Sequence, residues 1–246
     1  MKIVGGTDVG NVRPANEDYY KIFKFNERSF CAVVADGMGG HKGGKVASTT
    51  AANIIVDHIR ENIADAKNDD EIISVITRGV NIANEQIYIQ SITIDELEGM
   101  GTTAVIVYCK DDEIFVANVG DSRLYVVKDT IHQVTKDHSY VQDLVDKGII
   151  APEEAATHPN KNLITKALGT EIKIEADFFK LDAEPGLKLV LCTDGLSNFV
   201  DDKTIEKTVK ENSIEAANKI LIDLAKENGG RDNITLINIE FYEVKK

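Results

Sequence analysis

The order of strand-like and helix-like segments most limits what this chain can fold into. Short β-type runs occupy residues 2–36, 101–135, 175–194 and 233–242. One amphipathic helix pair is expected from 42 to about 66 and over 72–87, and another over 203–228. Runs of strands interrupted by helix pairs favour antiparallel sheets with helices on their outer faces over an alternating βαβ fold. About nine or ten strands are too many for one comfortable sheet. The sequence therefore predicts an α+β fold: a four-layer αββα sandwich of two antiparallel sheets, each covered by a helix pair.

Neighbouring strands are expected to pair. The apolar runs KIVGGTD, YYKIFKF and SFCAVVAD are separated by turn residues, which predicts an antiparallel meander over residues 2–36. The runs between 101 and 135 predict a further series of hairpins. A polar turn at residues 67–70 is expected to join the first two helices.

Size, composition and charge exclude several classes of protein. The 246 residues fit one domain, 1–246, and 43% hydrophobic with 28% charged residues is ordinary for a soluble globular protein. The net charge of −13 opposes contact with nucleic acid or an anionic membrane and favours a monomer.

The cysteines indicate a reducing compartment. Cys31, Cys109 and Cys192 are odd in number, far apart and placed in or beside apolar runs, so we interpret them as reduced core residues of a cytoplasmic protein. No CxxC pair is present to bind zinc. No apolar stretch is long enough for a signal peptide or a membrane span.

Residues 137–165 have weak periodicity and contain Pro152 and Pro159. This pattern predicts a surface insertion with short helices, able to form a flap over a site. We expect substrate selectivity to reside in residues 139–162 of this flap.

Carboxylates stand at the ends of many predicted strands. They are Asp8, Glu17, Asp18, Asp36, Asp121, Asp194 and Asp232. A lone Asp-Gly pair is usually a turn signal, but several strand-end acids at one edge would repel one another by ~4 kcal/mol per pair at 4 Å and an effective dielectric near 20. Such a cluster must hold protons or cations. Carboxylate oxygens without cysteine suit Mg²⁺ or Mn²⁺.

Two nearby features each leave alternatives open. Arg13, close before Glu17 and Asp18, is either a charge-balancing partner of the carboxylates or a clamp for a phosphate. The glycine-rich residues 39–45 match the phosphate-loop pattern G-x-x-x-x-G-K, but Val46 stands where that loop needs Ser or Thr. An NTPase is therefore a minor alternative, and the glycines better suit a tight turn into a helix.

Eight sequence blocks together resemble one family. TDVGNVRPANED, VADGMGGHKGGKVAS, GTTAV, VGDSRLY, VTKDHS, ITKALGT, LCTDGLSN and GGRDNIT occur in the order found in the metal-dependent protein phosphatases of the PPM (two-C) class, compact bacterial type. The resemblance covers essentially the whole chain. It implies hydrolysis of phosphoserine and phosphothreonine in proteins, opposing a bacterial Ser/Thr kinase.

The resemblance also implies a set of metal ligands. Asp36 would bridge two Mn²⁺ or Mg²⁺ ions, Gly37 would offer its backbone carbonyl, and Asp194 and Asp232 would complete the first ion's shell. Asp121, together with Asp194, matches the ligands of a third ion in bacterial members.

Further residues would act around the ions. By the same resemblance, Glu17 and Asp18 would act through metal-bound waters, and Arg13 would hold the phosphate. A water activated by the ions would attack phosphorus directly. No cysteine begins a Cys-x5-Arg loop, so no thiol phosphatase is indicated. A binding module that has lost turnover is disfavoured because every metal-matching acid is present.

One position departs from the family pattern. Met38 stands where many eukaryotic relatives have a histidine proposed as general acid. The proton would have to come from a metal-bound water or from a nearby histidine. His41, His138 and His158 are the candidate histidines, although each better suits a structural or solvated role, and we assign none of them to catalysis.

Overall fold

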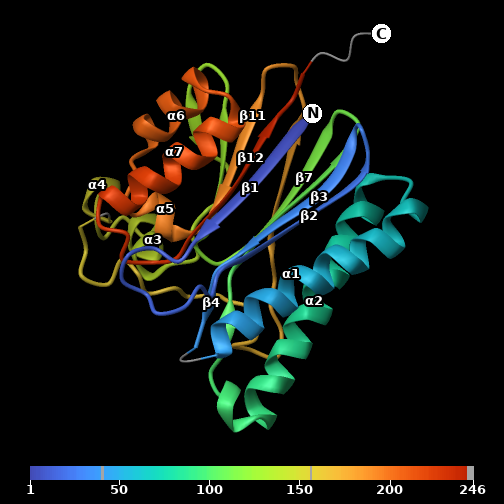
Figure 1. Cartoon of the computed structure of the whole chain (residues 1–246). Helices are drawn as coiled ribbons and strands as arrows, with labels where there is room; N and C mark the ends of the chain where they lie inside the picture. The colour runs from blue at the N-terminus through green and yellow to red at the C-terminus, as the bar shows by residue number, and fades with distance from the viewer. Residues whose placement is uncertain (40–41, 156, 243–246) are drawn as a thin grey trace.

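The strands form two five-stranded antiparallel sheets (Figure 1). The computed structural model describes residues 1–39, 42–155 and 157–242. The first sheet runs in the order β1 (Lys2–Asp8), β12 (Ile234–Glu240), β11 (Lys188–Cys192), β8 (Arg123–Val127) and β9 (Ile131–Gln133). The second sheet runs in the order β10 (Asp177–Asp182), β7 (Glu113–Val119), β6 (Ala104–Lys110), β3 (Ser29–Ala35) and β2 (Tyr19–Asn26). The short strands β4 (Gly37–Met38) and β5 (Gly101–Thr102) pair with each other.

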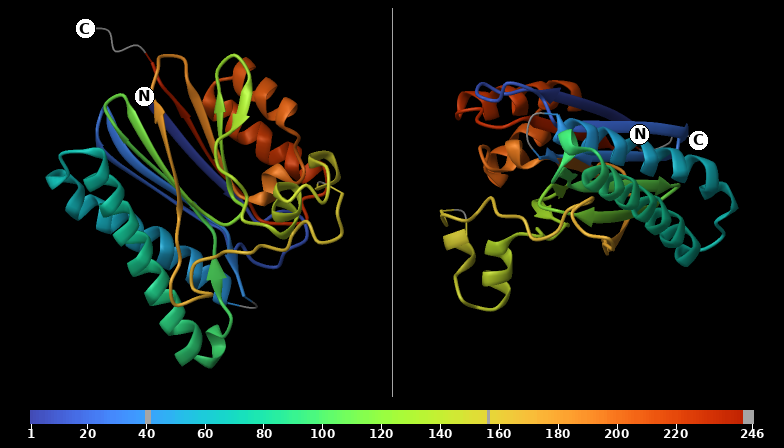
Figure 2. Two further views of the ribbon diagram at one scale, coloured as in Figure 1. Left: turned by 180° about the vertical axis from the view of Figure 1, so that it is seen from behind. Right: turned by 90° about the horizontal axis from the view of Figure 1, so that it is seen from below.

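Helices cover the outer face of each sheet, as Figures 1 and 2 show. The second sheet carries α1 (Gly43–Asn62) and α2 (Asp69–Thr93), and the first carries α5 (Asp194–Ser197), α6 (Asp202–Glu211) and α7 (Ile214–Glu227). Short 3-10 helices follow α1 at Ile63–Asp65 and α2 at Asp95–Leu97. Among the residues described, no helix has the length and apolar content to cross a bilayer.

Three hydrophobic clusters fill the spaces between the four layers. Ile55 and Ile76 pack in the cluster between the α1–α2 pair and the second sheet. Val34 and Ile237 belong to the cluster between the two sheets, and Leu221 to the one under α7. The predicted αββα sandwich is confirmed.

The predicted N-terminal meander is wrong for its first strand. β1 pairs along its whole length with β12, from Lys2 opposite Glu240 to Asp8 opposite Ile234, whereas β2 pairs with β3 in the other sheet. Gly5 lets β1 lie close to β2 of the other sheet, because a Cβ at Gly5 would lie 2.3 Å from the Tyr20 ring. The chain thus uses its two ends to build one sheet.

The hairpin prediction also fails between β7 and β8. These consecutive strands lie in different sheets, so the short connection at Gly120 and Asp121 crosses the sandwich. Gly120 has a φ of +105°, a backbone conformation that favours glycine. The crossing puts Asp121 at the end of both sheets.

The turn predicted at residues 67–70 is shorter than expected. Asn68 accepts a hydrogen bond from the backbone N–H of Glu71 and is the N-cap of α2. Asp69 and Asp70 therefore lie in the first turn of the helix, where negative charge favourably faces the helix N-terminus.

The predicted insertion lies between β9 and β10. It contains α3 (Tyr140–Asp146) and α4 (Pro152–Ala155), and Figure 2 shows it standing away from the sheets. Its base is tied down where Thr165 donates its backbone N–H to the carbonyl of His138.

Candidate active site

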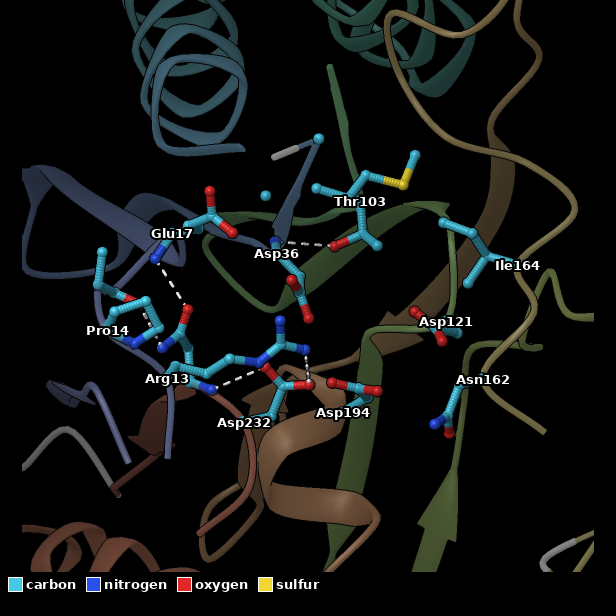
Figure 3. Close-up of a pocket in the computed structure, with 15 residues that line it drawn as sticks. Arg13, Pro14, Glu17, Asp36, Thr103, Asp121, Asn162, Ile164, Asp194 and Asp232 are labelled. Atoms are coloured by element: carbon cyan, nitrogen blue, oxygen red, sulfur yellow. Dashed lines mark hydrogen bonds and ion pairs between the residues drawn. The ribbon is translucent and has the colours of Figure 1, made fainter. Parts of the chain in front are cut away.

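An acidic cavity of about 430 Å³ opens at one end of the sandwich (Figure 3). Strand ends from both sheets surround it. Its lining includes Arg13, Glu17, Asp36, Gly37, Met38, Thr103, Asp121, Asn162, Ile164, Asp194, Asp232 and Asn233. Most of the predicted site residues, from distant parts of the sequence, therefore share one cavity.

Each acid reaches the cavity from a strand end. Asp36 directly follows β3, Asp194 begins α5 after β11, and Asp232 precedes β12. Asp36 is fixed by its backbone: its N–H donates to Thr103 Oγ1 at 2.9 Å, and its carbonyl accepts from the Thr103 N–H at 2.9 Å and Thr102 Oγ1 at 2.8 Å. A rigid backbone holds the carboxylate toward its neighbours.

The carboxylates perturb one another strongly. Burial, followed by repulsion from Asp18 and Asp194, raises the pKa of Asp36 well above its usual 3.8. Burial and then Asp194 raise the pKa of Asp121 to about 8. The pKa of Asp194 is also raised, by burial and then by Asp232. Negative charge here is costly unless protons or cations offset it.

Asp18 is only 1% exposed and is absent from the lining of the cavity. Its Oδ2 accepts a hydrogen bond from Thr193 Oγ1 at 2.9 Å. Burial raises the pKa of Asp18 to about 7, against the opposing hydrogen bonds from Thr235 and Thr193 and with a further contribution from Asp194. Asp18 is therefore part of the electrostatic cluster although it does not line the cavity.

The donor set fits a hydrated divalent cation. Glu17 Oε1 and Asp18 Oδ1 are buried without a hydrogen-bond partner among the described residues. A Cβ at Gly37 would lie 2.0 Å from the Gly44 carbonyl oxygen, so only glycine fits there. Within residues 1–39, 42–155 and 157–242, no three Asp, Glu, His or Cys side chains are grouped tightly enough to hold an ion by themselves. Backbone carbonyl and water oxygens would have to complete any coordination shell, which suits Mg²⁺ or Mn²⁺.

Arg13 lies at the rim and forms an ion pair. Its Nη2 donates to Asp232 Oδ2 at 2.8 Å, and its side chain is 49% exposed. This contact raises the pKa of Arg13 and keeps it charged. Arg13 thus balances the charge of Asp232, and its side chain is exposed enough to contact a phosphate as well.

Asp8 does not join the cluster. It forms an ion pair with Lys226 Nζ at 2.9 Å and does not line the cavity. The acid at the end of β1 therefore stabilises the contact with α7 instead.

Sequence reasoning assigned no role to Asn233, which organises the rim. Asn233 Oδ1 accepts the Glu17 N–H at 2.8 Å, and its Nδ2 donates to the carbonyls of Val9 and Ala15 at 2.9 and 3.0 Å. One buried side chain thus holds the loop that carries Arg13. The only hint of this role in the sequence was that Asn233 directly follows Asp232 in the block GGRDNIT.

The described histidines do not line the cavity. His138 accepts the Gly120 N–H on Nδ1 at 3.0 Å, and its Nε2 lies 3.2 Å from Asp177 Oδ2. His158 Nδ1 accepts the Asn160 N–H within the flap, and His41 lies outside the described residues. His138 and His158 thus bond to groups outside the acidic cavity, in agreement with a structural role.

The phosphate-loop alternative gains no support from Lys45. Its Nζ donates to the backbone carbonyl of Asp18 at 2.9 Å and lies over the Tyr19 ring, and Lys45 does not line the acidic cavity. A phosphate-loop lysine would instead face bound phosphates.

The flap contributes to the site. Asn162 and Ile164 line the acidic cavity. A smaller cavity of about 200 Å³ lies between the flap and the acids Asp121 and Asp194. Residues of the flap therefore border the acids.

Comparisons with known proteins agree with this geometry. The family model for protein phosphatase 2C matches residues 11–221. The chain is 37% identical over 236 residues to the serine/threonine phosphatase stp of Listeria welshimeri, covering 95% of this chain and 93% of that protein. The solved serine/threonine phosphatase of S. agalactiae superposes with a TM-score of 0.91 at 35% identity, covering 97% and 98% of the two chains. The catalytic domain of the phosphatase PstP, solved with two manganese ions, superposes with a TM-score of 0.83 at 32% identity, covering 98% of each chain. The chain belongs to the protein phosphatase 2C family.

Proposed function

We propose that this protein hydrolyses phosphoserine and phosphothreonine in other proteins and needs Mn²⁺ or Mg²⁺ to do so. The observation that carries the proposal is the cluster of carboxylates with raised pKa values in one cavity, with Arg13 at its rim. Similarity to serine/threonine phosphatases supports the reaction, and the manganese-bound relative supports the ion.

We assign the residues of the acidic cluster as follows. Asp36, Asp194, Asp232 and the Gly37 carbonyl would hold two ions, Glu17 and Asp18 would act through waters, and Asp121 with Asp194 would hold a third ion. When bound, the ions would supply Lewis acidity, offsetting phosphate charge and activating water.

The chain's own groups bind and orient the substrate. Arg13 can turn its exposed side toward a phosphate and donate two parallel hydrogen bonds. The thioether of Met38 lines the cavity and cannot protonate the leaving serine or threonine oxygen. The proton would come from another group, and we assign that role to water in the cavity.

The setting of the reaction is part of the proposal. Cys31, Cys109 and Cys192 are free and buried, which suits the reducing cytoplasm. There the enzyme would oppose a Ser/Thr kinase.

Crystals soaked with Mn²⁺ and examined by anomalous scattering would identify the ion and count its sites.

Phosphate release from a phosphothreonine peptide tests the function. Activity should require Mn²⁺ or Mg²⁺, stop with a chelator, and fall more than about 100-fold in Asp36→Asn, because even residues that only orient a metal ligand cost about 10- to 100-fold. Circular dichroism would confirm that the variant is folded. Activity that survives both the chelator and Asp36→Asn would refute the proposal.

A further inference from the structure

A groove at the C-terminal end of α2 is lined by exposed aliphatic side chains. Its volume is about 580 Å³, larger than that of the acidic cavity. Ile92 and Ile94 line it and are 64% and 43% exposed. Figure 1 shows the last turns of α2 extending beyond both sheets. Single exposed isoleucines are common, but neighbouring ones in a concave site mark an interaction surface.

The fold does not use these side chains for its own packing. α2 contacts the core through the opposite face of the helix, where Ile76, Val80 and Ile87 are buried. Ile92 and Ile94 therefore remain available to a partner.

Gly169 and Thr170 form a second side of the groove, next to α2, and hydrogen bonds hold this segment in place. Leu168 and Thr102 exchange backbone hydrogen bonds at 2.8 and 3.0 Å, and the Gly169 N–H donates to Asn84 Oδ1 at 2.8 Å. Gly169 has a φ of +86°, and a Cβ there would lie 2.2 Å from Ile87 Cγ2. A residue with a side chain could not bring the backbone this close to α2. A preformed groove costs little ordering on binding.

The negative charge at the groove indicates the kind of partner that would bind there. Asp95 and Glu98 line the groove, and its described lining contains no lysine or arginine. Acidic groups beside an aliphatic floor would repel nucleic acid, an anionic membrane and a second copy of a chain with net charge −13. They attract a chain that combines aliphatic and basic side chains.

We propose that this groove binds a segment of a partner protein in which aliphatic residues are flanked by lysine or arginine. The aliphatic side chains cover Ile92 and Ile94, and the basic groups face Asp95 and Glu98. Such a contact holds a partner without filling the acidic cavity. The inference does not depend on phosphatase activity.

Binding of a synthetic peptide tests the groove. A fluorescent peptide of alternating leucine and lysine pairs would be titrated with the full chain in Mn²⁺, and its anisotropy measured at physiological salt. We expect saturable binding that weakens about tenfold in Ile92→Asp and severalfold in Asp95→Lys. A peptide with glutamate in place of lysine should not bind.

Matched variants separate the groove from general charge attraction. Ile172 is 70% exposed but does not line the groove, and Asp223 is an exposed acid on α7. Ile172→Asp and Asp223→Lys should bind the peptide like the original chain. Absent binding, or equal weakening in all four variants, would overturn the proposal. A dimer in sedimentation that Ile92→Asp dissociates would also overturn it, by showing a second copy in the groove.

Discussion

Replacing Asn233 by alanine should disable the rim of the acidic cavity while leaving the acids in place. The change removes three hydrogen bonds, to the Glu17 N–H and to the carbonyls of Val9 and Ala15. Each contributes about 0.5–1.5 kcal/mol net. The free energy of unfolding should therefore fall by about 3 kcal/mol, and the Tm by roughly 6–12 °C.

The effect on catalysis should exceed what lost stability explains. Without Asn233 the loop of residues 9–17 keeps its contacts through Asn11 and the Arg13–Asp232 ion pair but loses three hydrogen bonds beside the cavity, so Arg13 is held less firmly. Misplacing a binding group by about 1 Å can cost on the order of 100-fold. We expect kcat/KM for a phosphothreonine peptide to fall about 10- to 100-fold, and inorganic phosphate to inhibit more weakly. Both would be measured well below the variant's Tm.

Asn84 offers a matched control. It is buried like Asn233 and also makes three hydrogen bonds, to Gly169, Glu171 and Ile172, but these lie against α2. Asn84→Ala should lose similar stability and keep its kcat/KM. In the Arg13→Ala background, Asn233→Ala should cost little more, because both changes remove the same contact. Equal kinetic losses in the two asparagine variants, or full additivity with Arg13→Ala, would refute the reasoning.

Three further outcomes are expected. Because the pKa values of Asp18 and Asp121 rise to about 7 and 8 on folding, the folded chain binds more protons than the unfolded one between pH ~4 and ~8, so the metal-free Tm should fall as pH rises through this window. Mn²⁺ should raise the Tm more at pH 8 than at pH 5.5, and an equal rise at both would contradict the linkage. Thr193→Val removes a donor to Asp18 and should raise the Mn²⁺ concentration needed for half-maximal activity severalfold, whereas an unchanged requirement would exclude this role. Gly37→Ala, whose Cβ would lie 2.0 Å from the Gly44 carbonyl oxygen, should weaken activity about 100-fold, and retained activity would show that the Gly37 backbone is free to move.

The layer architecture could be predicted because it follows from local periodicity. Helices with one apolar face and strands with alternating or continuous apolar residues determine what must be covered. The pairing of β1 with β12 could not be predicted in this way. It joins residues 2–8 to 234–240, and nothing in either run specifies a partner so distant in sequence.

The grouping of strand-end acids in one cavity was predictable for a different reason. Asp36, Asp194 and Asp232 stand next to apolar strands, and the resemblance to a family assigned them together. Asn233 acts through hydrogen bonds to backbone groups of a distant loop, and backbone groups leave no pattern in a sequence. Asp8 shows the opposite kind of failure. Its position at a strand end resembles that of the other acids, but it pairs with Lys226 and not with the cluster.

The distribution of the acids over both sheets links the cavity to the core. Asp36 extends from a strand of one sheet, whereas Asp194 and Asp232 adjoin strands of the other. The distance between these carboxylates therefore depends on how Val34 and Ile237 pack between the sheets. Ions shared by both groups would join the two sheets, so that ion affinity and inter-sheet packing become parts of one free energy. Apolar residues between the sheets would thus contribute to the chemistry of a site that they do not touch.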